Sequence, residues 1–303
     1  MILQAIADGL LTGAIVALGA IGVTFSLAIL RFANFSHGDL LALGAYSALF
    51  LLALIGAGGE PLGPFSFGWP MVAALAGAMA LAVAVSLLLD RFVYARLRRR
   101  SADPLTLVFA SFGLALLLRS VLHLIFGPDP YTYSTEIQLA IRLPGGVRVM
   151  PDQMLVFALT ALVLAALGWF LQRTRYGIAM RSVAENPVLA GVAGIDTTAI
   201  VRLTWAVATA LAALAGVFYG ITVQLRPEMG INLLLPLFTA AILGGVGSVG
   251  GAVVGALLIA LVESLVITLW LPTGYRPLVP FVLLLAVLYL RPQGLFGVRG
   301  RVA

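Results

Sequence analysis

The sequence of 303 residues contains no lysine and no cysteine, and its only two histidines are His37 and His123. Without lysine, the chain cannot build the phosphate-binding loop of an ATPase or a Schiff base with pyridoxal phosphate. Without cysteine, it has no disulfides, thiolate nucleophiles or cysteine-ligated metal sites. Two histidines so far apart in the chain also argue against a zinc centre. The sequence therefore argues against ATP hydrolysis by this chain, pyridoxal phosphate chemistry, thiolate catalysis and zinc catalysis.

Charged residues are also scarce. They make up 10% of the chain, whereas hydrophobic residues make up 62% and the mean hydropathy is +1.11. We therefore predict an all-α polytopic integral membrane protein. A spanning helix needs about 20 apolar residues, and eight runs come near that length. A ninth run, 233–243, is shorter and could form a partial or re-entrant helix. We therefore expect eight to nine transmembrane helices. The eight longer runs are 9–30, 40–57, 69–89, 105–126, 153–170, 202–223, 252–270 and 278–290.

The basic residues are all arginines, and they cluster at the ends of apolar runs. Cytoplasmic loops are enriched in basic residues, so the 90–104 connector, the 171–200 segment and the tail with Arg291, Arg299 and Arg301 are predicted to be cytoplasmic. The 58–68 connector, with Glu60 as its only charge, and the 127–152 connector are then outer loops. Alternation predicts an outer N-terminus and a cytoplasmic C-terminus. We treat 1–303 as one integral domain that contacts the lipid bilayer and binds no nucleic acid.

A polar segment, 31–39, separates the first two apolar runs and crowds several donors and acceptors into a few positions. Irregular polar backbone beside two spans suits either an aqueous turn or a protein-enclosed wet cavity. We expect a break between helices at the inner part of a solute path, with Gly38 supplying a positive φ for a tight reversal. The imidazole of His37 could relay protons or form a hydrogen-bonded strut beside Asp39. The predicted pathway residues here are Asn34, Ser36, His37, Gly38 and Asp39.

Glycines mark a second irregular region, 244–251, which follows the half-length run at 233–243. We include Gly244, Gly245 and Gly247 in the predicted substrate pathway. Glycines spaced four apart also favour close helix packing in membranes. We take the pairs at 9 and 13, 216 and 220, and 251 and 255 as candidate packing faces.

A long polar connector spans about 171–200 and has helical signals. Asn186-Pro187 can break or restart a helix, and Gly194 can end one, so a short cytoplasmic helix flanked by turns is expected. The connector could simply bind lipid headgroups, but its mixture of both charge signs with small and apolar residues favours docking of a soluble partner. The predicted docking residues are Gly177, Arg181, Ala184, Glu185, Asn186 and Gly194.

Three ionisable residues lie inside apolar runs, where a charge is costly unless it is paired. Arg119 and His123 are one helical turn apart, and Glu263 lies near the middle of the 252–270 run. One interpretation pairs Glu263 with Arg119 between helices. The alternative gives these residues a direct role in moving solute or protons.

Four elements in this order resemble the permease subunits of branched-chain amino acid ABC transporters, nearly end to end. They are the 34–39 segment, the 172–196 connector, the 244–251 glycine turn and the closing 291–297 segment, Arg-Pro-Gln-Gly-Leu-Phe-Gly. In that family the first element usually reads Asn-Phe-Ala-His-Gly with an acid after it, so Ser36 is a minor departure.

This resemblance implies an importer that translocates branched-chain or related amino acids across the inner membrane of a bacterium. It implies a heterodimer with a second permease subunit, two cytoplasmic ATP-binding subunits and a periplasmic or surface solute-binding protein. The connector then corresponds to the region that couples to the ATPase. The resemblance implies no cofactor of the chain's own, and ATP is used by the partner subunits.

Two other functions fit the same residues. A proton-coupled secondary transporter of small solutes could use His37, Asp39 or Glu263 and would need no ATPase. Related permeases also take up urea or short amides through similar frames. A membrane enzyme would need clustered acids or a metal-binding set, which the sequence does not offer.

Overall fold

A computed structural model of the chain describes residues 1–56, 62–134, 138–143 and 145–297. These residues form a bundle of helices with a single two-stranded hairpin among them. The helices of the first half are α1 (Ile2–Phe25), which a π-helical turn η1 (Ser26–Leu30) continues, α2 (Ser36–Ile55), α3 (Trp69–Leu89) with a second π-helical turn η2 (Asp90–Tyr94), α4 (Ala95–Arg99) and α5 (Pro104–Phe126). The remaining elements are β1 (Ile141–Arg142), β2 (Arg148–Val149), α6 (Pro151–Arg173), α7 (Arg175–Glu185), α8 (Pro187–Val192), α9 (Thr197–Thr222), α10 (Met229–Gly244), α11 (Val249–Leu269), the 3-10 turn η3 (Thr273–Tyr275) and α12 (Leu278–Leu290).

Within the described residues, eight helical segments are long and apolar enough to cross a membrane, and α10 is a shorter apolar helix of 16 residues. The chain is thus an all-α polytopic membrane protein, as predicted. The 90–104 connector differs from expectation, because η2 and α4 extend α3 into one rod of 31 residues, Trp69–Arg99. Leucine, alanine and arginine are strong helix formers, so the arginines of this connector up to Arg99 lie on helix. Glu60, Arg299 and Arg301 lie outside the described residues.

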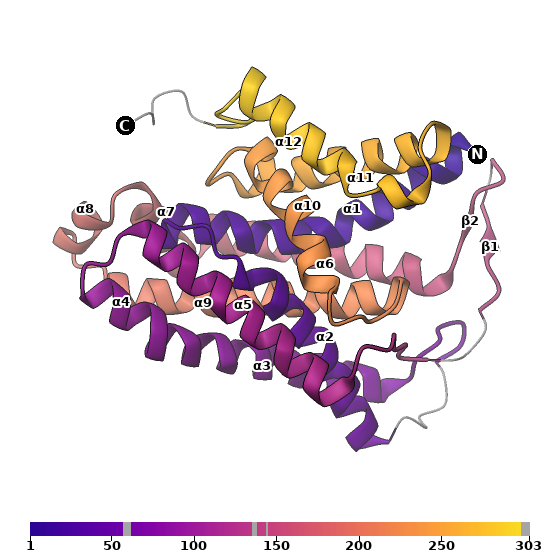
Figure 1. Cartoon of the computed structure of the whole chain (residues 1–303), viewed down its shortest axis with the longest axis horizontal. Helices are drawn as coiled ribbons and strands as arrows, with labels where there is room; N and C mark the ends of the chain where they lie inside the picture. Colours follow the sequence, from indigo (N-terminus) through magenta and orange to yellow (C-terminus); the bar gives the residue numbers. More distant parts are fainter. Residues whose placement is uncertain (57–61, 135–137, 144, 298–303) are drawn as a thin grey trace.

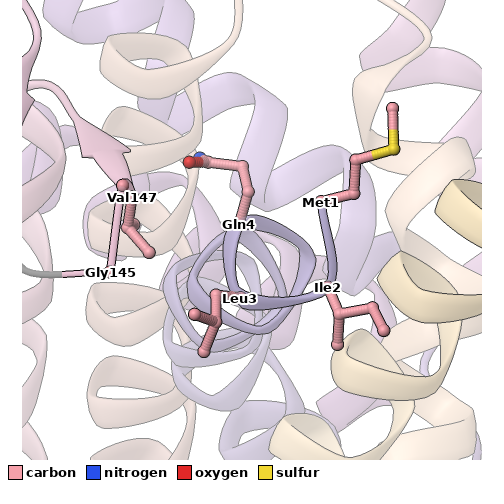
Figure 2. Close-up of a pocket in the computed structure, with 7 residues that line it drawn as sticks. Met1, Ile2, Leu3, Gln4, Gly145 and Val147 are labelled. Atoms are coloured by element: carbon pink, nitrogen blue, oxygen red, sulfur yellow. The ribbon is translucent and has the colours of Figure 1, made fainter.

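Different elements lie at the two ends of the bundle (Figure 1). The N-terminus and the β1–β2 hairpin lie at one end, whereas α7 and α8 lie at the opposite end. The side chain of Gln4 joins the N-terminus to the hairpin: its Nε2 donates to the Arg148 carbonyl oxygen (3.0 Å) and its Oε1 accepts from the Arg148 N–H (2.9 Å). Figure 2 shows the shallow pocket beside this contact, between residues 1–4 and the tip of the hairpin.

The centre of the bundle is α1, which packs against α6, α9, α10 and α11. Hydrophobicity alone does not drive helices together in lipid, so small residues that allow close backbone approach carry much of this packing. A Cβ on Gly9 or Gly13 would press against the Cα of Leu261 or Leu257 on α11. The predicted small-residue face on α1 is therefore confirmed.

The glycine turn between α10 and α11 is covered by the chain's own tail. The N–H groups of Leu295 and Phe296 donate to the carbonyl oxygens of Leu243 (2.7 Å) and Gly244 (3.1 Å). Gly245 has a φ of +103°, and its missing side chain leaves room for the backbone of Gly297. The closing 291–297 segment thus fixes the end of α10.

Candidate functional site

The predicted break between the first two spans exists and lies inside the protein. After η1, Arg31 adopts a left-handed φ of 61° at the end of the helix, and α2 begins only at Ser36. The ring Nε2 of His37 lies 3.0 Å from the carbonyl oxygen of Gly19. Gly19 precedes the end of η1 at Leu30 by eleven residues, which is about 16 Å along a helix. The chain therefore turns back into the bundle, and α2 starts at roughly mid-depth.

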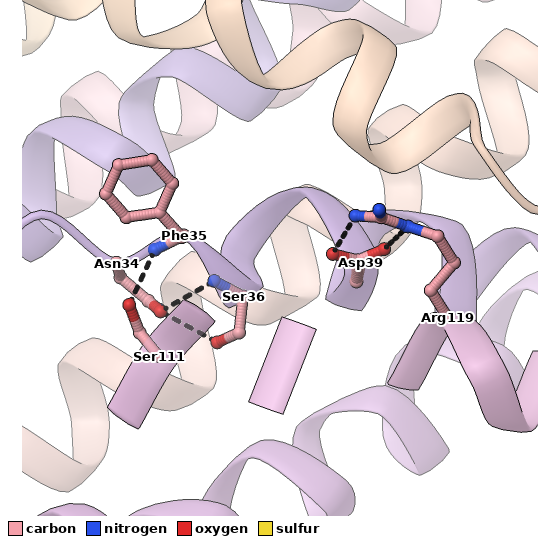
Figure 3. A network of polar contacts seen from close by, with 6 residues as sticks. All are labelled: Asn34, Phe35, Ser36, Asp39, Ser111 and Arg119. Carbon is pink, nitrogen blue, oxygen red and sulfur yellow. Dashed lines mark hydrogen bonds and ion pairs between the residues drawn. The ribbon is translucent and has the colours of Figure 1, made fainter. Parts of the chain in front are cut away.

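Side chains from three segments hold this break. The Oδ1 of Asn34 accepts from the N–H of Ser36 (3.1 Å) and from its hydroxyl (2.7 Å), which is an Asx-type turn that starts α2. The Tyr94 hydroxyl lies 3.2 Å from the Ser36 hydroxyl and 3.4 Å from Asn34 Oδ1. On the other side, the Ser111 hydroxyl accepts from the N–H of Phe35 (3.0 Å). Figure 3 shows the Asn34 and Ser111 contacts together with the neighbouring ion pair.

Polar atoms remain unpaired in this region. The Nδ2 of Asn34 and the Nε1 of Trp205 are buried and have no hydrogen-bond partner among the described residues. Trp205 stacks on Tyr94 with ring centroids 4.9 Å apart. A buried donor without a partner costs free energy, so these two groups are candidates for contacts with a polar guest.

His37 is a strut, but not to Asp39 as the sequence suggested. Because the Gly19 carbonyl can only accept, the His37 ring donates from Nε2, and the side chain ties α2 to α1. Its ring also fills the space above Gly22, where a Cβ would collide with it. The residue is 1% exposed.

Gly38 does not supply a positive φ. It lies in the first turn of α2 with helical backbone, and the positive φ in this segment belongs to Arg31. Gly38 instead allows the backbones of α2 and α10 to approach closely. A Cβ on Gly38 would collide with the carbonyl of Gly230 on α10, and a Cβ on Gly230 would collide with the carbonyl of Gly38. The starts of α2 and α10 thus cross backbone to backbone.

Asp39 forms an ion pair across the bundle. Arg119 of α5 donates from Nε to one carboxylate oxygen (3.1 Å) and from a terminal nitrogen to the other (3.0 Å), and the Asp39 side chain is only 2% exposed (Figure 3). A two-point contact of this kind is among the stronger polar interactions in proteins. It joins α2 to α5 one residue beyond the Gly38 contact.

The expected pairing of Glu263 with Arg119 is therefore wrong. Glu263 instead pairs with Arg276, at 2.6 Å, near the η3 turn. His123, one turn beyond Arg119, pairs with Glu228 at the start of α10, at 3.1 Å. Sequence spacing alone could not decide between these partners, because the choice depends on how the helices are placed.

The predicted pathway glycines of the 244–251 turn pack helix ends together. Gly244 lies against Gly251, and the nearest neighbour of Gly247 is Ala28 of η1. Among the contacts of the described residues, none joins these glycines to the hydrogen bonds of Asn34 or Asp39. Gly244 and Gly245 thus lie where α10, α11 and the closing segment meet, and Gly247 lies near η1.

The polar connector is helical, as its signals indicated, but it forms two helices, α7 and α8, where one short helix was expected. The Thr174 hydroxyl accepts from the N–H of Gly177 (3.0 Å) at the start of α7, and Asn186 Oδ1 accepts from the N–H groups of Val188 and Leu189 at the start of α8. Gly194, with a φ of +84°, follows the end of α8.

This connector has an inner and an outer face. Met180 and Val183 are buried against the spans, whereas Arg181 and Glu185 are exposed. Sequence reasoning missed three exposed apolar side chains on α8: Val188, Leu189 and Val192 are 73%, 65% and 84% exposed. It also missed Tyr94, Ser111 and Trp205, which lie far from the 34–39 segment in the chain and carry no local signal of their role.

Comparison with known proteins identifies the family. A family model described as "Branched-chain amino acid transport system / permease component" matches residues 5–288. LivH, a permease protein of the high-affinity branched-chain amino acid transport system of Escherichia coli K12, is 31% identical over 306 residues, covering 97% of this chain and 95% of LivH. BraD, the corresponding permease protein of Pseudomonas aeruginosa, is 33% identical over 309 residues, covering 97% of this chain and 95% of BraD.

A solved structure, PsaBC from Streptococcus pneumoniae in complex with Fab, shares the fold with a TM-score of 0.53. The alignment covers 96% of this chain and 92% of that chain at 12% sequence identity, so the likeness concerns the fold alone. Together with the spans, the family match makes this chain a multi-pass protein of the bacterial inner membrane. The chain belongs to the branched-chain amino acid transport system permease family.

Proposed function

We propose that this chain is the membrane permease subunit of an ATP-driven importer for branched-chain or related amino acids. The observation that carries the proposal is the end-to-end family match, residues 5–288. The chain forms half of the channel, and a second permease subunit forms the other half. It receives solute from a binding protein. It has no ATPase site of its own, and two cytoplasmic subunits hydrolyse ATP instead. Urea or short amides are the alternative substrates.

The break at 34–39 lines the inner part of the translocation path in this proposal. A zwitterion with an aliphatic side chain needs a few polar groups among apolar walls, without a strong fixed site, so that release is easy. The unpaired Nδ2 of Asn34 supports this, because it is a buried donor beside a helix start. The 244–247 glycines act on this path indirectly, by fixing the end of α10.

A proton-coupled mechanism has weaker support. Asp39 and Glu263 each face an arginine, at 3.0 Å and 2.6 Å, and the described Nε2 contact of His37 is to a backbone carbonyl. A proton relay needs groups that exchange protons with one another or with water. These contacts favour structural roles for all three residues.

The proposed orientation, with the N-terminus outside and the C-terminus in the cytoplasm, can be tested with single cysteines because the native chain has none. Thr132→Cys, at an exposed position in the connector that precedes the hairpin, should react with an impermeant maleimide added to whole cells. Ser101→Cys, exposed just after α4, should react only after the membrane is opened. Labelling of position 101 from outside would reverse the orientation.

The α7–α8 connector is the proposed contact with the ATPase, with Gly177, Arg181, Ala184, Glu185, Asn186 and Gly194 shaping it. Glu185→Arg should lower transport per ATP hydrolysed, or reduce co-purification of the ATPase by roughly tenfold, because it puts a like charge near Arg181 on an exposed face. The measurement is solute uptake and ATP hydrolysis by the purified complex.

Arg99→Glu is the matched control for this experiment, since it reverses an exposed charge at the end of α4. It should leave the ratio of transport to hydrolysis near that of the unmodified complex. Intact transport and intact co-purification in Glu185→Arg would remove this residue from the joint.

A further inference from the structure

A cavity lies between the spans and α7, and none of its lining residues belongs to the 34–39 break. Its volume is about 340 Å³, and it is lined by α1, α6, α7 and the start of α11. Most of its wall is apolar, including Ile21 and Phe25 of α1, Leu164 of α6 and Val253 of α11. The space is therefore suited to an alkyl chain rather than to a column of water.

The mouth of this cavity is positively charged. Among the described residues that line it, Arg181 of α7 and Gln172 of α6 are the polar side chains, and none is a carboxylate. Arg181 is exposed and has no hydrogen bond or ion pair among the described residues. The cavity therefore offers an anion a free guanidinium beside an apolar slot.

The position of the cavity matches a lipid headgroup region. Ile29 lies one residue before the end of η1, Leu171 lies two residues before the end of α6, and Val249 begins α11. The ends of three membrane-spanning segments thus meet the polar helix α7 here. Basic side chains at such a level attract anionic lipids.

We propose that this cavity holds one anionic phospholipid of the cytoplasmic leaflet, with an acyl chain between α1, α6 and α11 and its phosphate at Arg181. A free amino acid fits less well, because its ammonium group finds no carboxylate in the lining. The site goes beyond transport itself and needs only that α7 face the inner membrane surface. The lipid fills the space behind the helix that is proposed to contact the ATPase.

Two glycines allow a clean test. A Cβ on Gly168, which lines the cavity from α6, meets no atom within 4 Å, so the side chain of Gly168→Phe starts in open space and can place its ring in the cavity. Gly113 on α5 is equally open and lies outside the cavity lining, so Gly113→Phe is the matched control. Arg181→Gln removes the charge and leaves the cavity open.

The probes are dioleoyl phosphatidylglycerol and dioleoyl phosphatidylcholine, added to the purified permease in detergent and counted by native mass spectrometry. The unmodified chain and Gly113→Phe should retain one phosphatidylglycerol in preference to phosphatidylcholine. Gly168→Phe should lose this retained lipid, and Arg181→Gln should weaken phosphatidylglycerol binding by about fivefold.

Unchanged phosphatidylglycerol binding in both Gly168→Phe and Arg181→Gln would overturn the proposal, as would displacement of the lipid by leucine. Equal binding of the two lipids by the unmodified chain would also contradict it. The assay uses no ATP and no transport, so its failure is distinguishable from failure of the proposed importer function.

Discussion

Replacing Gly38 with leucine should abolish solute uptake. The starts of α2 and α10 cross with the backbone of Gly38 against that of Gly230, and even a Cβ at either position collides with the opposite carbonyl. Overpacking a well-packed site costs about 1–3 kcal/mol, and occasionally more. Because backbone rather than a flexible side chain is in the way, we expect α10 to be displaced and the thermal stability of the purified chain to fall. Uptake at matched expression, together with a melting curve, measures both effects.

The matched control is Gly113→Leu, which places the same side chain on a span at a position where an added Cβ meets no atom within 4 Å. It should retain uptake and melting temperature. Gly230→Leu should reproduce the defect from the other side of the contact, and Gly38→Ala should be intermediate. Normal uptake by Gly38→Leu at normal expression would show that the crossing of α2 and α10 does not matter for transport.

Removing the Asp39 carboxylate should strongly lower the stability of the folded chain. Asp39→Leu leaves the Arg119 guanidinium, 16% exposed, without its carboxylate inside the spans. Breaking a buried ion pair by removing one partner costs about 3–5 kcal/mol, whereas replacing both partners with apolar residues is often neutral. The double variant Asp39→Leu with Arg119→Met should therefore recover most of the melting temperature and yield that the single variant loses.

His123→Gln is the control on the same helix. It removes the contact of His123 with Glu228, whose side chains are 34% and 45% exposed, and even fully charged exposed pairs contribute only about 0–1 kcal/mol. Its melting temperature should stay close to that of the unmodified chain. A single Asp39→Leu variant that melts like the unmodified chain would contradict a stabilising role for the pair. If the double variant is stable but inactive, the pair has a second role in transport.

Local signals in the sequence predicted much of the fold. Long uncharged runs predicted the spans, Asn186-Pro187 indicated the break between α7 and α8, and glycine spacing predicted close helix packing, although not that the Gly9 and Gly13 face would meet α11. These features depend on residues close together in the chain. The point at which the third spanning helix ends was harder to predict. The arginines that follow α3 mark the membrane surface but also favour helix, and the helical rod continues through η2 and α4 to Arg99.

The partners in the candidate site could not be predicted in the same way. The break at 34–39 was visible as a cluster of polar residues, but Tyr94, Ser111 and Arg119 reach it from other helices. A titratable residue within a span must have a partner, yet only the placement of helices decides which one. The role of Gly38 was misassigned for the same reason, since the Gly230 backbone that occupies its side-chain space comes from a distant segment.

Reconstitution into liposomes tests the proposed function most directly. The purified permease, with its second permease subunit and ATPase subunits, is placed in vesicles with the solute-binding protein outside, and uptake of radiolabelled leucine is measured with and without ATP inside. The account predicts uptake that requires ATP and the binding protein and that persists when a protonophore collapses the proton gradient. Leucine uptake by this chain alone, driven by a proton gradient without ATP, would contradict it.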